Sequence, residues 1–461
     1  MRELSAIRFT EGEPLFIQIY HFIKDEILRN QITHEEFLPS IRSCAQSLAV
    51  SKNTVEVAYQ LLVSEGYISS IPKKGYQVTY KAGPPSGQHA TEREDSRIPS
   101  IRYDFRYGNI ELGAFPFHPW NKLRNKLISY HQRTYMVEGL AQGEYVLRKE
   151  LSKLLHETRG VLATPEQIII GATPQQLVSI VVQLLDREKH VIGVENPGYD
   201  GARNTFLNGG YRVHGISLEA DGVSIEELTR SGASIMYVSP SQQFINKMTM
   251  PLEKRNQLTL WAQSLSHSYL VEDDYEWEFK YQESYIPSIQ SLSPQKVVYI
   301  GRLSKALLPL VNVSYVVLPY ELLSRFHQRV PEYDQPVSRL DQLTLAAYLS
   351  DGYWHRHLQN MRKNYMEKRE VFLQAVACYM DGRVEIEGKD TGLHVFLTVK
   401  SQRTEAELME RAYQKGVKVY GTARYWLHDT REHPTVLLGY GALTPDDIQE
   451  GIRLLANAWF E

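Results

Sequence analysis

The sequence is poor in cysteine, in net charge and in long apolar runs. Only Cys44 and Cys378 occur among 461 residues, far apart and without partners at metal spacing. This argues against a disulfide framework or a zinc site and suits a reducing compartment. No run of about eighteen apolar residues and no amino-terminal charged-then-apolar segment is present, so neither membrane insertion nor export is expected. These absences favour a cytosolic protein without a bound metal.

The formal net charge is only -3 at pH 7, so the overall balance gives no sign of a nucleic-acid partner. Acidic residues in the amino-terminal region offset the basic ones there, and a DNA-binding surface would have to be local. The composition changes once along the chain, since residues 81–103 are polar, contain Pro and Gly and lack a sustained apolar period. We therefore expect a flexible linker at 81–103 between a domain at 1–80 and a larger domain at 104–461.

The pattern of residues 1–80 predicts a winged helix-turn-helix fold. Apolar residues recur at helical spacing in three segments, and Ser51 can cap the third. The segment 66–78 alternates around a Lys-Lys-Gly turn, as a two-stranded wing does. Because the third helix of such a fold lies in the major groove, its first residues are expected to face the bases. The outward residues are Lys52, Asn53, Thr54 and Glu56, with Lys73 and Lys74 at the wing tip.

Beyond the linker, short runs rich in Val and Ile alternate with longer helical patterns. The runs lie at 167–170, 190–194, 234–238, 269–271 and 296–300. This alternation predicts an α/β fold with a mostly parallel, buried sheet. From about Tyr333 onward, helical segments precede candidate strands at 392–397, 417–420 and 435–438. That part is expected to form a smaller α+β lobe.

Four features of the larger part match the needs of a pyridoxal phosphate (PLP) pocket. PLP has to be tethered as an imine, kept protonated at its ring nitrogen and anchored by its phosphate. Lys305 follows a predicted strand and can supply the imine. Asp273 or Asp274 ends the neighbouring strand and can hold the ring proton, and Tyr275 can bind the ring oxygen. The helix predicted after Gly171 offers a phosphate site. Each feature alone has an ordinary structural explanation, but together they occur in the order such a pocket requires.

Sequence strings in both parts resemble known families. Those of the amino-terminal part, such as Leu38-Pro-Ser-Ile-Arg42 and Ala49-Val-Ser-Lys-Asn-Thr-Val55, resemble the GntR family of bacterial winged-helix regulators. The strings Glu195-Asn-Pro-Gly-Tyr199, Val271-Glu-Asp-Asp-Tyr275 and Gly392-Leu-His394 resemble fold-type I aminotransferases. The whole chain is similar to the MocR/GabR subfamily of GntR-type transcription regulators. This resemblance implies regulation of transcription at a DNA operator, PLP as cofactor and an amine or amino-acid-like effector.

The resemblance also implies roles for single residues. Lys305 would be the Schiff-base lysine, Asp273 the partner of the pyridinium, Tyr275 the phenol at the ring oxygen and Tyr199 the aromatic ring stacked on the cofactor. Ala172 and Thr173 would lie beside the phosphate, and Ser304 is expected to bind the cofactor as well. The residues expected to contact DNA are Arg42, Ser51, Lys52, Asn53, Thr54, Lys73 and Lys74.

Three departures from the family pattern stand out. Asn312 replaces an Arg that would clamp the phosphate, and Arg302, three residues before the lysine, is hypothesised to supply the missing charge instead. His433 stands where the family has the Arg that binds the effector carboxylate, with Arg431 as a possible substitute and Arg424 as another. Finally, 240–244 reads Pro-Ser-Gln-Gln-Phe where the family usually has Ser-His-Gln.

Three functions remain open on these grounds. The favoured interpretation is a PLP-dependent regulator that exchanges its Lys305 imine for an amine effector, with vestigial aminotransferase activity. The first alternative is an active aminotransferase with an accessory DNA-binding domain. The second is a PLP-free sensor that keeps the fold, which the change at Asn312 would permit. By analogy with aminotransferases, a homodimer that reads two half-sites is expected.

Overall fold

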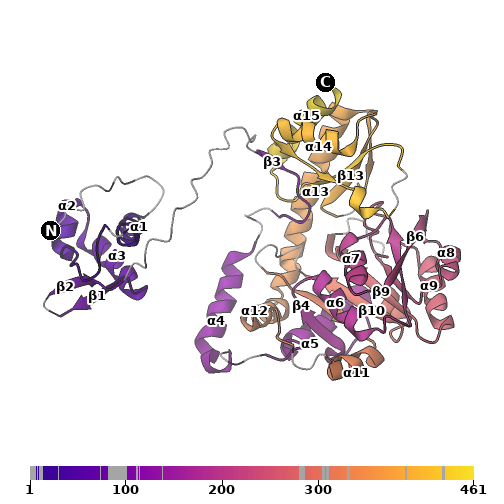
Figure 1. Ribbon diagram of the computed structural model, residues 1–461, viewed down its shortest axis with the longest axis horizontal. Helices are drawn as coiled ribbons and strands as arrows, with labels where there is room; N and C mark the ends of the chain where they lie inside the picture. Colours follow the sequence, from indigo (N-terminus) through magenta and orange to yellow (C-terminus); the bar gives the residue numbers. More distant parts are fainter. Residues whose placement is uncertain are drawn as a thin grey trace. The chain divides into compact units, whose positions relative to one another are not determined.

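The chain divides into two compact units, Met1–Ile98 and Pro99–Glu461, in the computed structural model (Figure 1). The residues that the structure describes are 7, 9, 14–29, 31–72, 74–80, 101–110, 113, 115–135, 137, 139–279, 286–303, 307, 311–329, 333–389, 392–427 and 431–461. The expected linker lies largely outside these ranges, as do Lys73, Ser304 and Lys305. Among the helices described, none is long and apolar enough to cross a bilayer.

The first unit has the helix-turn-helix and the wing that the sequence predicts. Its elements are α1 (Leu15–Leu28), α2 (Ile41–Ser47), α3 (Lys52–Ser64), β1 (Ile68–Ile71) and β2 (Gly75–Val78). The strands of the wing are antiparallel, with Ile68 opposite Val78.

Local chemistry explains where the helices of this unit begin. The hydroxyl oxygen of Ser51 accepts a hydrogen bond from the backbone N–H of Thr54 (3.1 Å) and caps α3, and Ser40 caps α2 in the same way. Between the two helices Ala49 has a φ of 54°, the left-handed conformation that closes the tight turn. The apolar stripe of α3 is buried against α1, as shown by the completely buried Val55 and Leu62. The first residues of α3 are therefore turned outward.

An eight-stranded sheet forms the centre of the second unit. Its order is β4-β11-β10-β9-β8-β5-β6-β7, and β11 and β7 are the strands that run antiparallel to their neighbours. The bounds are β4 (Ile168–Gly171), β5 (Val191–Asn196), β6 (Arg212–Glu219), β7 (Gly222–Val223), β8 (Ile235–Val238), β9 (Tyr269–Asp274), β10 (Val297–Arg302) and β11 (Ser314–Val317). The predicted α/β fold and its five buried strands are confirmed. The sequence pattern missed β11, which separates β4 from β10.

Helices cover both faces of this sheet. The helices α6 (Pro174–Leu184), α7 (Asp200–Asn208) and α11 (Tyr320–Arg329) pack on one face, where Val271, Ile300 and Val316 form the core. The helices α5 (Tyr145–Arg159), α8 (Ile225–Arg230), α9 (Leu252–Ser264), α10 (Ile289–Leu292) and α12 (Arg339–Ser350) pack on the other, and α4 (Phe117–Tyr135) lies against α12. Burial on both faces explains why the strands read as continuous apolar runs.

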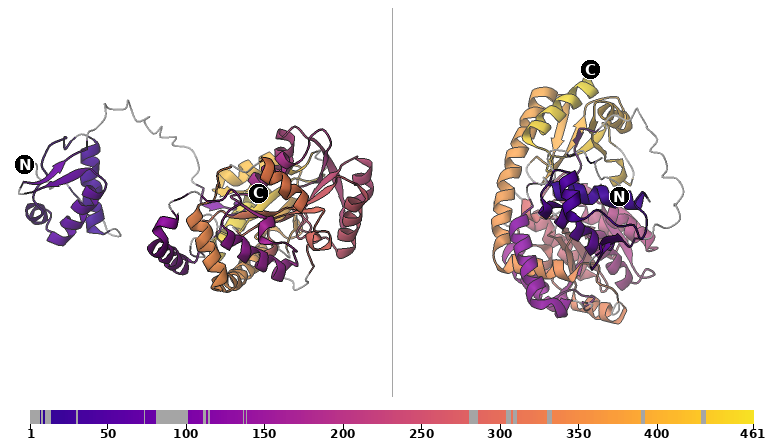
Figure 2. Two further views of the ribbon diagram at one scale, coloured as in Figure 1. Left: turned by 90° about the horizontal axis from the view of Figure 1, so that it is seen from below. Right: turned by 90° about the vertical axis from the view of Figure 1, so that its left-hand side faces the viewer.

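The carboxyl-terminal part forms the expected smaller α+β lobe. Its sheet has the order β12-β13-β16-β15, and β14 pairs separately with β3. The elements are β3 (Tyr103–Asp104), α13 (Tyr353–Met380), β12 (Val384–Glu387), β13 (His394–Val399), α14 (Glu405–Gln414), β14 (Val417–Lys418), β15 (Tyr420–Gly421), β16 (Thr435–Gly439) and α15 (Pro445–Phe460). The strand predicted at 417–420 is thus two strands in different sheets. The long helix α13 joins the lobe to the larger sheet (Figure 2, right).

Candidate functional site

The carboxyl ends of the six strands that run in one direction meet at one edge of the large sheet. There Arg302 at the end of β10 lies directly opposite Ser314 of β11, and Ser314 lies opposite Gly171 at the end of β4. Such an edge is where open α/β sheets hold their ligands. The register therefore brings Arg302 into one row with the loop that leads into α6.

The two adjacent aspartates at the end of β9 face opposite sides of the sheet. Asp274 accepts from the Arg159 guanidinium (2.7 Å) and from the Tyr299 hydroxyl (2.7 Å) on the α5 side. Burial opposes ionisation of Asp274, but these partners outweigh it and hold its pKa below the ordinary value. Asp273 is buried on the α6 side, where the Tyr237 hydroxyl donates to its Oδ2 (2.5 Å). Of the two, Asp273 is the one that shares its face with α6 and α7.

Aromatic side chains line the space next to Asp273. Tyr199 occupies the position just before α7, and the centroid of its ring lies 5.9 Å from that of Phe244. Burial raises the pKa of Tyr199 to about 12; the Asp273 carboxylate adds to this rise and the Arg302 guanidinium opposes it. Tyr275 is buried, and the centroid of its ring lies 6.0 Å from that of Phe244. The structure thus brings together Tyr199, Asp273, Tyr275 and Arg302 from three different segments.

The start of α6 carries the groups predicted to bind an anion. The hydroxyl oxygen of Thr173 accepts from the N–H of Gln176 (3.2 Å) and caps the helix, which leaves the hydroxyl proton for another acceptor. The N–H of Ala172 donates to the side chain of Gln176 (3.0 Å). Within the described ranges, Arg302 Nε and the buried hydroxyl of Ser314 have no hydrogen-bond partner. Unsatisfied donors of this kind, in one row with the residue that leads into a helix N-terminus, suit an anionic ligand.

The string 240–244 that departs from the family pattern contributes to this framework. Ser241 Oγ accepts from the Arg159 guanidinium (2.6 Å), and the Gln242 amide donates to Glu276 (3.1 Å). Gln243 Oε1 accepts from two backbone N–H groups of the following loop, and its amide nitrogen donates to the carbonyl of Pro197 (2.9 Å). These residues hold the loops after β5, β8 and β9 together.

Sequence reasoning missed a buried lysine in this region. Lys247 Nζ lies 3.3 Å from the Tyr275 hydroxyl, 3.4 Å from His394 Nδ1 and 3.7 Å from Glu276 Oε2. Neither helical nor strand periodicity marks Lys247, because it lies in the loop between β8 and α9. Its φ of 58° is a conformation that glycine adopts most easily. The one signal that the sequence offers is that Lys247 is a charged residue in a loop segment, 239–251, whose other residues are uncharged.

The two residues assigned to the effector lie in the loop before β16. The Arg431 guanidinium donates to the Thr422 hydroxyl (2.5 Å) and to Glu405 (3.3 Å), and it lies over the Trp426 ring at 4.2 Å. Trp426 in turn packs against the aromatic cluster around Phe244. His433 is half-buried. Arg431 is therefore already engaged at the margin of that cluster.

In the amino-terminal unit, the predicted DNA-contacting side chains differ in exposure. Arg42, Lys52, Asn53 and Lys74 are exposed. Thr54 is half-buried, and its hydroxyl lies 2.7 Å from that of Ser51, so both hydroxyls take part in the cap of α3. The arrangement leaves Lys52 and Asn53 as the outermost groups at the start of α3.

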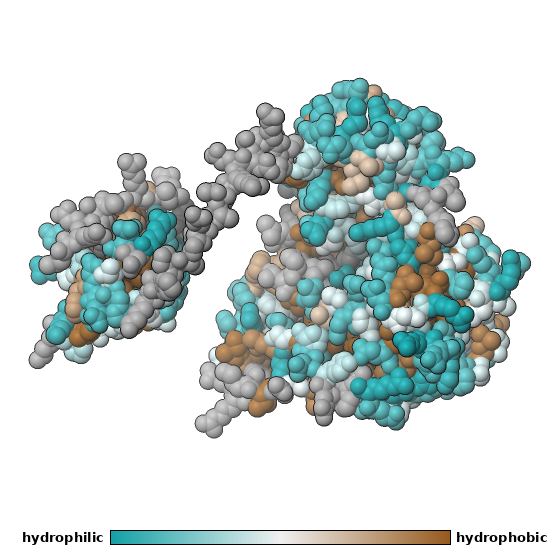
Figure 3. Space-filling view, viewed as in Figure 1, coloured by the Kyte–Doolittle hydropathy of each residue, from teal (hydrophilic) through white to brown (hydrophobic). Residues whose placement is uncertain are grey.

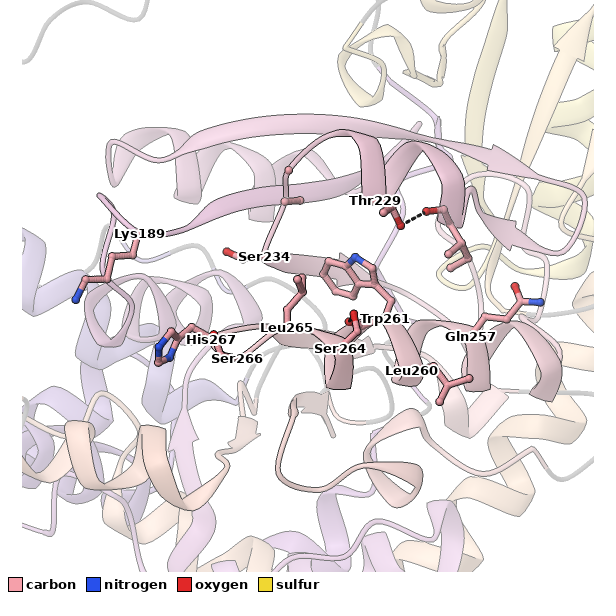
Figure 4. A pocket seen from close by; sticks show the side chains of 13 residues that line it. Lys189, Thr229, Ser234, Gln257, Leu260, Trp261, Ser264, Leu265, Ser266 and His267 are labelled. Atoms are coloured by element: carbon pink, nitrogen blue, oxygen red, sulfur yellow. Dashed lines mark hydrogen bonds between the residues drawn. The ribbon is translucent and has the colours of Figure 1, made fainter.

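A hollow of about 830 Å³ lies at the opposite edge of the large sheet (Figure 4). The Trp261 indole lies at its centre, with Lys189 and His267 toward one end and Gln257 and Leu260 toward the other. Lys189 and His267 precede β5 and β9, so this hollow adjoins the amino ends of the strands. None of the residues singled out from the sequence lines it, and the carboxyl edge remains the candidate site.

Comparisons with known proteins agree with this two-part architecture. Residues 16–78 match the family model for bacterial regulatory proteins of the gntR family. The chain is 37% identical over 459 residues to the uncharacterized HTH-type transcriptional regulator YdeL of Bacillus subtilis, covering 97% of both. It is 30% identical to the probable rhizopine catabolism regulatory protein MocR of Rhizobium meliloti, over 97% of this chain and 94% of that one.

Among solved structures, the chain is similar to the α-aminoadipate aminotransferase LysN of Thermus thermophilus, which was crystallised with N-(5'-phosphopyridoxyl)-L-leucine. The TM-score is 0.68 at 22% identity, over 77% of this chain and 91% of that one. The protein therefore joins a GntR-type DNA-binding domain to a domain with the fold-type I aminotransferase fold. The chain belongs to the MocR/GabR-type family and is a transcriptional regulator.

Glu195 at the end of β5 gives the site a pH dependence that can be tested. Its buried carboxyl accepts from the N–H of Ser239 (3.2 Å). Burial raises the pKa of Glu195 to about 8, and the Asp273 carboxylate adds to the rise. Between its ordinary pKa of 4.5 and about 8, the folded chain keeps a proton that the unfolded chain loses. The stability that this proton confers is complete below the lower value and is lost as the pH rises through about 8.

We predict that Glu195→Gln, which keeps an acceptor but cannot ionise, melts within a degree or so of the wild type at about pH 5 and on the order of 5 °C higher at about pH 9. Scanning calorimetry of the full chain across this range measures the difference. The control is Glu188→Gln at an exposed carboxyl, which should shift the melting temperature equally at both pH values. Parallel melting curves for Glu195→Gln and wild type at all pH values would contradict a buried, proton-holding Glu195.

Proposed function

We propose that this transcriptional regulator binds PLP at the carboxyl edge of its large sheet and reads an amine or amino-acid-like effector there. It would act as a homodimer in the cytosol and transmit the state of the pocket to its winged helix. The observation that carries the proposal is the convergence of Asp273, Tyr199 and Arg302 beside the start of α6. Asp273 offers a carboxylate for the ring nitrogen of PLP, Tyr199 an aromatic ring to stack on it, and Arg302 a cation for its phosphate. Each of the three comes from a different segment.

The described side chains fit the chemistry of PLP. Asp273 is an acceptor for a protonated ring nitrogen, and the Tyr237 hydroxyl bound to it steadies its carboxylate. Tyr199 supplies an aromatic face, and Tyr275 a phenol for the ring oxygen. The N-cap hydroxyl of Thr173 and Arg302, together with Ala172 and Ser304, would hold the phosphate. The unsatisfied Arg302 Nε and Ser314 Oγ support an anion at this place.

When bound, PLP supplies an electrophilic carbon for amines and a ring that withdraws electrons. The chain would contribute Lys305 as the tethering amine, Asp273 to keep the proton on the ring nitrogen and Tyr275 to donate to the ring oxygen. An amine effector would compete with Lys305 for the same carbon. The pocket would then report the presence of the amine by releasing the lysine.

The contacts of Arg431, an arginine assigned to the effector, favour a sensing role over transamination. A substrate carboxylate is ordinarily held by a guanidinium in bidentate fashion. Here Arg431 is held by Glu405 and Thr422 and stacked on Trp426. His433 would then contact the effector without a fixed charge. We propose that any aminotransferase activity is vestigial.

The exposed apolar side chains around the start of α5 support a homodimer. Val137, Leu140, Tyr145 and Val146 are 61%, 65%, 50% and 47% exposed. Apolar surface is visible where α4 leads toward α5 (Figure 3). Large exposed apolar side chains that are close together in the chain are consistent with a protein contact site.

Binding of PLP at Lys305 is tested by absorbance. We expect the purified chain with PLP to show an imine band that borohydride traps covalently, with the label recovered by mass spectrometry on the peptide that contains Lys305. Lys305→Ala should show neither the band nor the label, because no amine remains in position. Lys153→Ala, on α5, is the control. A wild type without a trapped band would leave a PLP-free sensor as the function, and formation of a keto acid from amino acids would favour the aminotransferase.

The role of Arg302 is tested by PLP affinity. Arg302→Ala should weaken PLP binding by about 10- to 100-fold, because charge-assisted hydrogen bonds to the phosphate are lost. The PLP affinity of Arg302→Lys should fall between those of Arg302→Ala and the wild type, since lysine keeps the charge but lacks the planar guanidinium. Equilibrium titration by absorbance measures both, with Arg212→Ala, at an exposed arginine of β6, as control. An unchanged affinity in Arg302→Ala would refute the compensation for Asn312.

Contacts of Arg42, Ser51, Lys52, Asn53, Thr54, Lys73 and Lys74 with DNA are part of the same proposal. For Lys52→Ala we expect weaker binding to all DNA sequences, and a slope of affinity against salt concentration that is smaller by about one, because one phosphate contact is lost. Gln60→Ala, at an exposed uncharged residue of the same helix, is the control. Fluorescence anisotropy with genomic DNA fragments at several salt concentrations measures both. An unaltered salt slope would remove Lys52 from the interface.

A further inference from the structure

A buried cluster of charged side chains lies beside Tyr275, where the large sheet meets the carboxyl-terminal lobe. Its members are Lys247, Glu276 and His394, whose side chains are 1%, 0% and 0% exposed. Lys247 Nζ lies 3.7 Å from Glu276 Oε2, and His394 Nδ1 lies 3.7 Å from Glu276 Oε1. Lys247 Nζ also lies 3.3 Å from the Tyr275 hydroxyl and 3.4 Å from His394 Nδ1. One ammonium group thus touches both the candidate site and the lobe.

The cluster joins two parts of the second unit. Lys247 and Glu276 come from the loops after β8 and β9, whereas His394 is the first residue of β13 in the lobe. Two glycines of the lobe leave room for the contact. A Cβ on Gly388 would collide with the stem of Lys247, and a Cβ on Gly392 would come within 2.6 Å of the Glu276 carboxylate. The two surfaces are therefore fitted to each other around these side chains.

The surroundings of Lys247 make its interactions strong. Its ammonium lies 5.4 Å from the ring centroid of Tyr275, 5.7 Å from that of Phe244 and 6.0 Å from that of Phe396. Aromatic faces attract a cation, and the exclusion of water strengthens its pairing with a carboxylate. Lys247 also keeps a left-handed backbone that most side chains avoid. A residue held in such a conformation is typical of functional positions.

We propose that Lys247 is a positioning residue that ties the Tyr275 hydroxyl to the carboxyl-terminal lobe through His394 and Glu276. A ligand that contacts the Tyr275 hydroxyl then changes how strongly β12 and β13 are attached to the large sheet. The link between Lys247 and the lobe stands independently of the cofactor. Its response to PLP rests on the function proposed above.

Hydrogen–deuterium exchange of the full chain, read by mass spectrometry on peptides covering β12 and β13, tests the link. The main variant is Lys247→Met combined with Glu276→Gln, because removal of both charges avoids a buried carboxylate without its partner. His394→Gln cuts the same link from the side of the lobe. The matched control is Lys254→Met, at another buried lysine, which pairs with Glu219 and Asp221 on the surface of the large sheet.

Without PLP, we expect these peptides to exchange about 10-fold faster in the double variant and in His394→Gln than in the wild type, as a local opening becomes easier. In Lys254→Met they should exchange at the wild-type rate. With PLP, exchange in the wild type should slow further, whereas the double variant should gain little or no protection. Wild-type exchange in both variants without PLP, or equal protection of wild type and double variant by PLP, would overturn the proposal.

The exchange experiment and the absorbance test of PLP binding together separate this inference from the proposed function. If the wild type shows no trapped PLP band, the cofactor proposal fails, and the comparison without PLP alone decides whether Lys247 holds the lobe. Melting temperatures within a few degrees of the wild type establish that the double variant is folded. Should the double variant be unfolded, His394→Gln, which leaves the pair of Lys247 and Glu276 intact, decides in its place.

Discussion

The buried ion pair between Arg159 and Asp274 fixes how β9 presents its two adjacent carboxylates. Side chains alternate between the faces of a strand, so the attachment of Asp274 to Arg159 and Tyr299 on the α5 side turns Asp273 toward α6 and α7. A shift of the strand by one residue that moved Tyr275 into the place of Asp274 would leave Arg159 buried without a carboxylate partner. Loss of one partner of such a pair is costly, which holds the register in place.

This register determines the rest of the candidate site. With Asp273 on the α6 side, residues on the same face of the neighbouring strands lie close to it, among them Tyr237 of β8 and Arg302 of β10. In the antiparallel strand β11, Ser314 lies opposite Arg302 on one side and opposite Gly171 on the other, so these three residues form one row across the sheet. The start of α6 and the end of β10, about 130 residues apart in sequence, thus serve one edge because a single strand lies between them.

Much of the fold could be predicted from the sequence because its strands are buried on both faces. Residues 168–170 and 297–300 are apolar throughout, and both runs lie in strands of the structure. In the amino-terminal unit, Ser51 could be identified as a cap because few residue types suit that position. The prediction of a single strand at 417–420 was wrong in its extent. Pairing with two different partners divides this segment into two strands, and no local sequence pattern contains that information.

The candidate site could be predicted only where motifs were contiguous. Asp273 and Tyr275 lie in one string, and the choice between Asp273 and Asp274 depends on Arg159, more than a hundred residues earlier. Lys247 could not be found from the sequence, because its partners Glu276 and His394 come from two other segments. The placement of Lys305 and Ser304 lies outside the described residues and stays a prediction.

The position of Asn312 is compatible with the proposal that a charge at residue 302 stands in for one at 312. Asn312 precedes β11 by two residues, and its side chain is exposed. The first residue of β11, Ser314, is opposite Arg302, so residues 302 and 312 belong to the same edge, one at the end of β10 and the other just before β11. A phosphate presents several equivalent oxygens, and a guanidinium can bind it from more than one direction. The loss of a cation from one strand is therefore compatible with an anion site if the adjacent strand supplies another, whereas the orientation of the bound anion would differ.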